Sequence, residues 1–315
     1  MVSNNVNFLK NWNLSIFDTI SGKKILEEKS STISSNVMAL QFLIYPFSGI
    51  GYPSWATIRC YNFSQTQENL FKEGQAVQFS VGLGAVSTTI FKGILKAFWG
   101  VYDKPDYIFE FYCLGLANDD QYNLTKQMVT IDIPKGSITE TSRSLANALA
   151  IPVVNIYGVD GTTLVPPLKI VAKNFYNAMD LYSNTAQVSY SYDHLKNFLN
   201  IYPNHKVNNQ NFIETPPANK IKLVDDVIGY PSVDVGTQNM SCTKLITNNI
   251  IYFRDVVKIN LNLLAFNNVI GAPDQKLVER NQNANFFIHT ISFSGDTRIG
   301  SNATWVQQIY GVAQS

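Results

Sequence analysis

Residues 55–84 read WATIRCYNFSQTQENLFKEGQAVQFSVGLG, residues 88–100 read TTIFKGILKAFWG, and residues 105–111 read PDYIFEF. The opening residues alternate in polarity, with Ala56, Ile58 and Cys60 on one face and polar or charged neighbours on the other. Alternation with a period of two is typical of a strand that buries one face. The stretch therefore begins with a half-buried strand.

A short helix is predicted directly after this strand. Ser64 followed by Gln67 has the S-x-x-Q pattern of a capping box, and Gly74 can adopt the left-handed conformation that ends a helix. A second alternating run then leads to Gly82 and Gly84, where the chain is expected to turn. The order strand, short helix, strand, hairpin strand, strand predicts a β-barrel crossed by one helix, and it contains no catalytic apparatus.

The composition predicts a folded subunit whose surface is largely covered by neighbours. The chain has 315 residues, of which 45% are hydrophobic and only 15% are charged. This length suits two or three domains, and the hydrophobic content is enough for a packed core. Because about a quarter of residues are charged in an average chain, we expect subunit contacts to cover much of the exterior. An ordinary secreted β-protein with a polar, uncharged surface is the alternative.

Charge and cysteine content exclude several other classes. A net charge of +1 gives no electrostatic case for nucleic-acid binding. Cys60, Cys113 and Cys242 are odd in number and far apart, which predicts buried, reduced thiols in a protein that folds in the cytoplasm. The N-terminus lacks the pattern of a signal peptide, and the longest apolar run, residues 37–47, falls short of the about 20 residues that a membrane span needs. We expect no membrane insertion.

The chain divides into three segments that together predict a mainly β fold, α+β overall. Residues 1–115 are expected to form the first barrel, residues 116–206 a small α+β middle module, and residues 207–315 a second barrel. The strands predicted in the first segment before the quoted stretch are residues 12–20, 24–29 and 36–47.

Two helices distinguish the middle segment. A capped helix is predicted over residues 137–150, with Leu145, Ala148 and Leu149 on one face. A second helix is predicted over residues 173–183. Its apolar side chains recur at helical spacing: Phe175, Ala178, Met179 and Tyr182. Strands are predicted between and after these helices.

The second barrel follows a polar, asparagine-rich linker over residues 207–219. A polar loop over residues 267–282 is long for a hairpin and is a candidate contact loop. The predicted strands of this barrel are residues 221–224, 256–264, 284–293 and 304–312. Both barrels have a similar order of elements without an obvious sequence repeat, which suggests an old duplication.

A search for catalytic groups argues against an enzyme. His194 and His205 lie in polar, turn-like contexts, where a solvated side chain is expected. His289 lies within a predicted strand, and Asp296 follows it beyond a turn predicted at Ser294 and Gly295. A Ser-His-Asp site is conceivable there, but the chain contains no G-x-S-x-G nucleophile elbow. We therefore expect no catalytic residues.

The sequence also predicts neither a metal site nor a cofactor. The histidines and cysteines do not cluster, and no H-x-x-x-H or C-x-x-C pair occurs. Adjacent carboxylates occur at residues 119–120 and 225–226, but they would point to opposite sides of an extended chain. The glycines at 82 and 84 lack the third glycine and the following helix of a phosphate-binding loop.

The aromatic residues raise a second class of function. The four tryptophans and many tyrosines could form stacking platforms for sugars or bases. Most of these rings fall within alternating strand patterns, where a barrel core or a subunit interface is the ordinary destination. The tryptophans are Trp12, Trp55, Trp99 and Trp305.

Three blocks of residues resemble a known family when they are taken in order. A second block covers residues 227–232 and 242–250, and a third covers residues 286–298 together with Trp305. The first block consists of Ile58, Tyr61, Asn62, Phe63, Ser64, Leu70, Phe71, Gly74, Val77, Ile90, Phe91, Gly93 and Ile94. Together the blocks span about residues 10–311 and resemble the baseplate hub proteins of contractile phage tails.

The resemblance implies a structural protein rather than an enzyme. Such hubs are homotrimers in which each chain contributes two tail-tube-like barrels, so that the ring matches a sixfold tail tube on one side and a threefold spike on the other. It implies further contacts with a tube-adaptor protein, and with tape measure and baseplate wedge proteins. DNA would pass through the channel only as a transient passenger, and the location would be the virion, after assembly in the host cytoplasm. It also implies that His289 and Asp296 pack together at a hairpin.

Two surfaces are candidate interfaces. The first is the exposed face of the helix predicted near residues 64–73, and the second is the polar loop of the second barrel. For both surfaces, the alternative is that these residues simply face solvent. For the whole chain, the alternatives to a hub are a carbohydrate-binding accessory module and a tail-tube subunit. The candidate residues are Gln65, Glu68, Asn69, Lys72, Asp274, Gln275 and Lys276.

Overall fold

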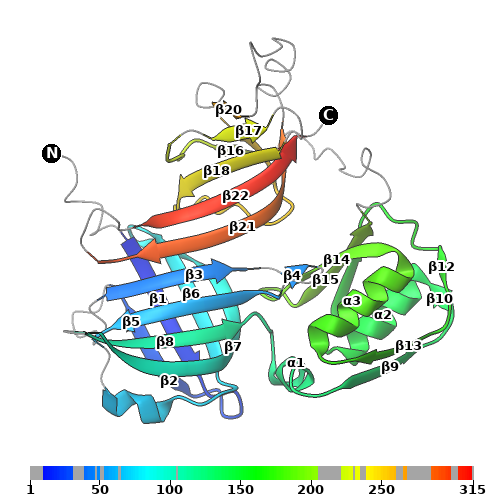
Figure 1. The fold of residues 1–315 in the computed structure, drawn as a ribbon, viewed down its shortest axis with the longest axis horizontal. Helices are drawn as coiled ribbons and strands as arrows, with labels where there is room; N and C mark the ends of the chain where they lie inside the picture. Colours follow the sequence, from blue (N-terminus) through cyan, green and yellow to red (C-terminus); the bar gives the residue numbers. More distant parts are fainter. Residues whose placement is uncertain are drawn as a thin grey trace.

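Strands dominate the structure, so the predicted mainly β class is confirmed (Figure 1). In the part that the structure describes, the helical elements lie in the first and middle segments. The computed structural model describes residues 10–30, 39–46, 48–49, 53–62, 65–103, 106–204, 221–229, 231–234, 239–259, 265–267, 285–298 and 304–313.

The first segment forms a curved antiparallel sheet, called here the first body. Its strands are neighbours in the order β2-β1-β6-β7-β8-β5-β3. The predicted alternation is confirmed in β5, where Ala56, Ile58 and Cys60 are fully buried. The strands are β1 (Lys10–Phe17), β2 (Lys24–Lys29), β3 (Ala39–Tyr45), β5 (Trp55–Tyr61), β6 (Ala76–Leu83), β7 (Val86–Asp103) and β8 (Asp106–Leu114).

The helix predicted after β5 is present in a tighter form. It is the 3-10 helix η2 (Gln65–Leu70), and the proposed capping residues lie outside the described side chains. Phe71 follows it and is buried against Phe109 and Phe111, with ring centroids 5.3 and 4.9 Å away. Gly74 has a φ of 95°, so the predicted left-handed conformation is confirmed. This single turn anchors an aromatic ring in the core before the chain enters β6.

The last segment forms a second curved sheet, called here the second body. Its strands follow the order β19-β21-β22-β18-β17-β20, with β16 beside β19. Strands β17 and β18 were not among the strands predicted from the sequence, and β21 runs straight through Ser294 and Gly295, so the turn predicted there is wrong. The strands are β16 (Lys222–Val224), β17 (Ser232–Asp234), β18 (Asn239–Leu245), β19 (Val256–Ile259), β20 (Ala265–Asn267), β21 (Phe286–Asp296) and β22 (Trp305–Ala313).

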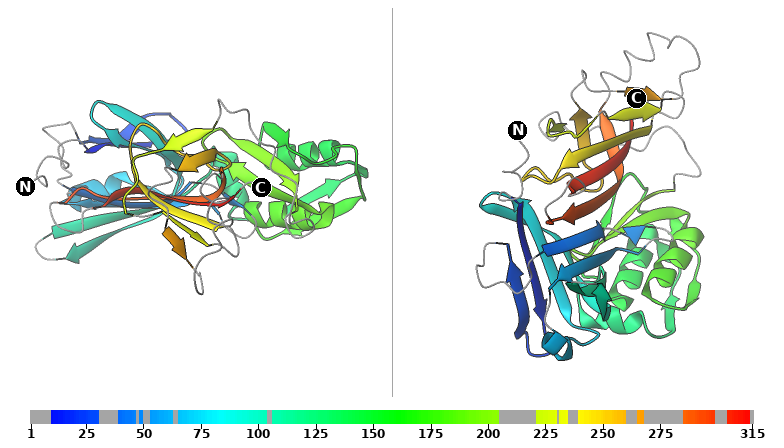
Figure 2. Two further views of the ribbon diagram at one scale, coloured as in Figure 1. Left: turned by 90° about the horizontal axis from the view of Figure 1, so that it is seen from above. Right: turned by 60° about the vertical axis from the view of Figure 1, so that its left-hand side comes forward.

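The two bodies share one continuous sheet. Strand β3 pairs with β5 on one side and with the end of β21 on the other, so that Phe293 lies opposite Ile44 and Asp296 lies opposite Gln41. The result is a 14-stranded sheet that contains strands from both ends of the chain. Figure 2 shows the first and last strands of the chain approaching one another across this junction.

The two bodies also repeat one ladder of strands. Strands β6, β7, β8, β5 and β3 are neighbours in the same order as β19, β21, β22, β18 and β17. A β-bulge interrupts the pairing of β7 with β8 between Leu95 and Ala97. The pairing of β21 with β22 is interrupted in the same way between Ile288 and Thr290. Because a bulge fixes register, the duplication suggested by the sequence is a structural repeat with matching positions.

The turn that enters each ladder repeats as well. The backbone N–H of Gly74 donates to the carbonyl of Leu95 at 2.9 Å, and that of Arg254 donates to the carbonyl of Ile288 at 2.8 Å. Both donors have a positive φ, 95° at Gly74 and 69° at Arg254. Arg254 therefore occupies the place that glycine occupies in the first body.

The middle segment packs helices against small sheets around a core of its own. Strands β14 and β15 are antiparallel, β11 runs parallel to β15, and β4 (Ser48–Gly49) from the first segment joins β14. The elements are α1 (Asp119–Leu124), β9 (Val129–Ile133), β10 (Gly136–Ser137), α2 (Ile138–Ala148), β11 (Val153–Ile156), β12 (Leu164–Val165), β13 (Leu168–Ala172), α3 (Phe175–Ala186), β14 (Val188–Asp193) and β15 (Phe198–Pro203).

Both predicted helices of this segment are confirmed. Ser137 and Glu140 form a complete capping box, in which the Glu140 carboxylate accepts from the Ser137 backbone N–H at 2.9 Å. Leu145 faces the core as predicted, whereas Ala148 is exposed and Ala146 takes its place. In α3 the predicted apolar face is entirely buried: Phe175, Ala178, Met179 and Tyr182.

The adjacent carboxylates at residues 119–120 lie in a helix and not in an extended chain. They lie in the first turn of α1, where carboxylates interact favourably with the helix dipole. The division of the chain at residues 115 and 206 stays a prediction. One cluster of buried apolar residues runs through both bodies, and a second lies in the middle segment.

Candidate functional site

His194 lies at the junction between the first body and the middle segment. It follows β14 and is 1% exposed, so the predicted solvated side chain is wrong. Its ring lies 5.1 Å from that of Phe91, and a Cβ added at Gly115 would lie 3.0 Å from it. Neither ring nitrogen has a hydrogen-bond partner among the described residues. Burial, with a smaller contribution from Lys92, lowers the pKa of His194 to about 3, so the imidazole is neutral.

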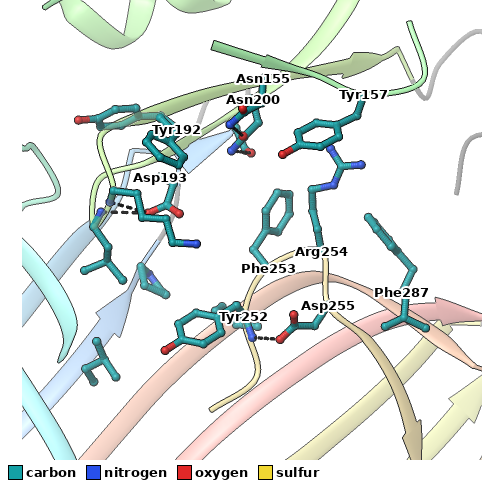
Figure 3. Close-up of a pocket in the computed structure, with 18 of the residues that line it drawn as sticks. Asn155, Tyr157, Tyr192, Asp193, Asn200, Tyr252, Phe253, Arg254, Asp255 and Phe287 are labelled. Atoms are coloured by element: carbon teal, nitrogen blue, oxygen red, sulfur yellow. Dashed lines mark hydrogen bonds between the residues drawn. The ribbon is translucent and has the colours of Figure 1, made fainter. Parts of the chain in front are cut away.

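A cavity of about 630 Å³ opens where all three segments meet. Its walls come from β11, β14 and β15 of the middle segment and from the turn before β19 of the second body (Figure 3). The residues labelled in the figure are Asn155, Tyr157, Tyr192, Asp193, Asn200, Tyr252, Phe253, Arg254, Asp255 and Phe287.

Arg254 crosses this cavity from the second body to the middle segment. Its guanidinium lies 4.5 Å from the ring centroid of Tyr157 and 4.8 Å from that of Tyr202. Phe287 of the second body lies at 5.7 Å from it. Stacking of this kind is worth about 0.5 to 2 kcal/mol for each contact. Arg254 therefore fastens the two parts of the chain together.

The polar side chains of the cavity are engaged with one another and with the backbone. Asp255 accepts from the ammonium of Lys222 and from the Tyr252 backbone N–H, both at 2.6 Å. Asn155 donates to the side-chain carbonyl of Asn200 at 3.0 Å. These contacts hold the cavity walls within each segment: the first two lie in the second body and the third in the middle segment.

The residues considered for a catalytic triad are separated. His289 is exposed on β21, while Asp296 is 6% exposed and lies at the other end of the same strand. Seven residues of strand correspond to about 23 Å, so the implied packing of His289 against Asp296 is wrong. Asp296 instead forms an ion pair with Arg298 at 2.7 Å and accepts from the amide of Gln41 at 2.9 Å.

The other chemistry-bearing residues also have structural surroundings. Cys60, Cys113 and Cys242 are free and buried, as predicted, and burial raises the pKa of Cys242 to about 12. No cluster of three histidine, cysteine or acidic side chains suitable for a metal occurs within the described residues. Among those residues, no helix has the length and apolar character needed to cross a bilayer.

The predicted interface residues are only partly described. Asn69 and Lys72 are exposed at the end of η2, whereas Glu68 is half-buried and accepts from the hydroxyl of Tyr107 at 3.1 Å. The side chain of Gln65 lies outside the described residues, as do Asp274, Gln275 and Lys276. Their role as contacts stays a prediction.

A further exposed surface was not singled out from the sequence. The end of the β7–β8 hairpin presents Trp99, Val101 and Tyr102, which are 40%, 45% and 70% exposed. By contrast, Trp12 and Trp305 are buried, and Trp55 packs between Tyr45 and Tyr112 on the side of the first body. Apolar residues occur all along β7, so the sequence alone does not show that those at its end are exposed.

Known proteins resemble this chain in fold rather than in sequence. No protein-family model matches it, and no curated protein sequence matches it. The tail protein from Neisseria meningitidis MC58 superposes with a TM-score of 0.56 over 96% of this chain and 97% of its own, at 8% identity. The prophage MuSo2 43 kDa tail protein from Shewanella oneidensis gives 0.54 over 96% and 97%, at 12% identity. The chain has the fold of phage tail proteins.

A similar fold occurs in a chain of a larger complex. A chain of the Francisella PdpA-VgrG complex superposes with a TM-score of 0.50 at 9% identity, over 96% of this chain and 58% of its own. At such low identity these matches establish the shared fold. They agree with the resemblance to baseplate hub proteins that the sequence blocks suggested.

Proposed function

We propose that this protein is the structural hub of a phage tail baseplate, a trimeric ring that joins the sixfold tail tube to a threefold central spike. The observation that carries the proposal is the repeated strand ladder. Each chain holds two bodies with the same strand order and the same bulge position. Three such chains place six similar bodies around one axis.

The likeness of both bodies explains how two symmetries meet in one ring. One side of the ring would present six similar bodies to the tube, while differences between the first and second body would leave threefold symmetry for the spike. Each first body would contact the second body of the neighbouring copy in a heterologous contact that closes. The partners would then be the tube or its adaptor, the spike, and the tape measure and wedge proteins.

The charge and the side-chain chemistry support a passive role. A channel that attracted phosphates strongly would hold DNA back, and the net charge of +1 is compatible with free passage. The candidate catalytic histidine and aspartate are far apart, and polar side chains along the walls of the junction cavity hydrogen-bond to one another. We propose that the protein acts without catalytic activity and without a cofactor, as a component of the virion.

The mass of the purified assembly tests this function. We expect native mass spectrometry to find three copies, and electron microscopy to show a threefold ring with six lobes. A hexamer would indicate a tube subunit instead. A chain that stays single at all concentrations and binds glycans saturably, with binding lost in Trp99→Ala, would indicate a carbohydrate-binding module.

A further inference from the structure

Strand β7 pairs with another strand along only part of the edge that faces away from β8. On the side away from β8 it pairs with β6, from Val86 to Ile94. The pairing with β8 continues to Asp103. Among the described residues, no strand pairs with residues 96–103 on the side that β6 leaves. The end of the strand therefore exposes backbone donors and acceptors that could receive another strand.

The second body shows what occupies the corresponding edge there. Strand β21 pairs with β19 only at Phe286 and Phe287, and its later residues, from Phe293 to Asp296, pair with β3. Counting from the shared bulge, Val101 corresponds to Ser294, Tyr102 to Gly295 and Asp103 to Asp296. The position that β3 occupies beside β21 therefore has no pairing strand beside β7 among the described residues of one chain.

The side chains at the unpaired end of β7 are apolar and exposed, as at a protein–protein interface. Val101 is 45% exposed and Tyr102 is 70% exposed, next to Trp99 at 40%. Where β21 pairs with β3, Phe293 and Asp296 are 1% and 6% exposed. An exposed apolar edge strand is a liability for a single chain, and pairing with another chain removes it.

Tyr107, held by helix η2, covers one face of β7 at Gly100. The side chain of Tyr107 lies directly over Gly100, where an added Cβ would meet its hydroxyl at 1.8 Å, and this hydroxyl donates to Glu68 of η2. The part of the free edge beyond this crossing begins at Val101. Its three residues, Val101, Tyr102 and Asp103, are the counterparts of three of the four residues that β3 covers in the second body.

We propose that this free edge receives the outer edge of the second body of a second copy, so that the sheet continues from chain to chain as it continues from β3 to β21 within the chain. The counterpart of β3 in the second body is β17, because β17 pairs with β18 as β3 pairs with β5. Beyond β17 lies the short strand β20, the last strand of the sheet in the part of the chain that is described, so β20 is the edge that the second copy presents. The inference rests on the proposed ring and names its contact.

The contact must join different copies. Strands β8, β5, β3, β21, β22 and β18 lie between β7 and β17 in the sheet. At about 4.8 Å per strand, the two edges of one chain are about 30 Å apart along the sheet. A short link between them can therefore form only between copies.

Crosslinking of the full chain tests the contact directly. A Tyr102→Cys, Ser232→Cys double variant would be treated with a bis-maleimide that spans two strand spacings, about 10 Å. The native cysteines are buried and do not compete. We expect covalent dimers and trimers. The control, Tyr102→Cys with Met128→Cys, places its second thiol on an exposed residue of the middle segment and should give only background.

Assembly mass provides the second test. Val101→Lys with Tyr102→Lys puts charge on the free edge, and we expect the trimer to dissociate to single chains that unfold at an unchanged temperature. Met128→Lys, at a similarly exposed site, should leave the trimer intact. A trimer that resists the double substitution and gives only background crosslinks would overturn this contact and leave the proposed function standing. A wild-type chain that never assembles would overturn both.

Discussion

Equivalent positions of the two bodies hold side chains of different chemistry. Phe109 of β8 packs on Phe71, with ring centroids 5.3 Å apart. In the second body the corresponding residue, Gln307 of β22, is fully buried, and its amide accepts from the Ile251 backbone N–H at 3.2 Å and donates to the carbonyl of the same residue. The chain before β19 is thus held by polar contacts where the first body uses aromatic packing.

Replacing this glutamine should be costly for stability. In Gln307→Leu, a buried N–H and a buried carbonyl of Ile251 lose their partner, and each unsatisfied group costs about 1 to 3 kcal/mol. We expect the free energy of unfolding to fall by about 2 kcal/mol or more in urea titrations. Gln308→Leu, on the exposed face of the same strand, loses only the bond from the Ser292 hydroxyl at 3.3 Å and should cost about 1 kcal/mol or less. Equal losses in both variants would contradict this role of Gln307.

His194 should make stability depend on pH. Since burial lowers its pKa to about 3, the folded protein holds a neutral ring, whereas the unfolded chain binds a proton below about pH 6.5. The stabilisation is therefore complete above pH 6.5 and is lost as the pH falls towards 3, by about 2 kcal/mol at pH 5. We expect His194→Leu to lose about this difference between pH 7 and pH 5.

The exposed His289 supplies the control for that measurement. His289→Leu makes the same substitution at an exposed position of β21 and should leave the pH dependence of stability as in the parent protein. If the two leucine variants have the same slope between pH 7 and pH 5, then His194 is not the group responsible.

At the scale of elements, the β7–β8 hairpin and η2 are joined through one side chain. Tyr107 of β8 reaches over β7 at Gly100, and its hydroxyl donates to Glu68 at 3.1 Å. An added Cβ at Gly100 would lie 1.8 Å from this hydroxyl, so only glycine leaves room for the crossing. The glycine is thus required by the close approach of a ring, at a place where the backbone itself is ordinary strand.

We expect Gly100→Ala to displace the Tyr107 ring and release η2. The cost should be about 1 kcal/mol, the usual worth of such a hydrogen bond, and amide exchange in η2 should become faster. Tyr107→Phe removes the same bond without a clash and should have a similar effect. Because both variants lose one contact, the double variant should cost less than the sum of the two. Strict additivity would contradict the crossing.

Local signals in the sequence predicted some elements well. The capping box at Ser137 and the helical spacing from Phe175 to Tyr182 were sufficient, since both depend on neighbours within a few residues. The turn at Ser294 was wrong because serine and glycine favour turns, while the pairing of β21 with β3 depends on residues far away in the sequence. The burial of His194 depends on a similar long-range contact with Phe91. No local pattern carries such information, and the cavity around Arg254 was missed for the same reason.

At the scale of the whole molecule, the two bodies are one packing unit. The buried cluster that contains Leu14 of the first body also contains Ile309 of the second. Lys10 donates to the backbone carbonyl of Asp296 at 2.8 Å, and the indole of Trp305 donates to that of Gly82 at 3.2 Å. These contacts join the first strand of the chain to its last hairpin, so the two bodies should unfold together.

Gly295→Ala tests this coupling at the junction itself. An added Cβ would lie 2.2 Å from the ring of Phe42 and 2.8 Å from that of Trp305, both of which are buried. Overpacking of this kind costs about 1 to 3 kcal/mol. Since the clash joins β21 to β3, we expect hydrogen exchange to rise in both bodies together, with the middle segment protected as before. Gly136→Ala, whose Cβ would lie 3.0 Å from the Glu140 carboxylate and in ordinary contact with Thr141, should confine any change to the middle segment. Faster exchange in the second body alone would show that each body is stable without the other. The junction between β3 and β21 would then not be what holds the two bodies in a fixed arrangement.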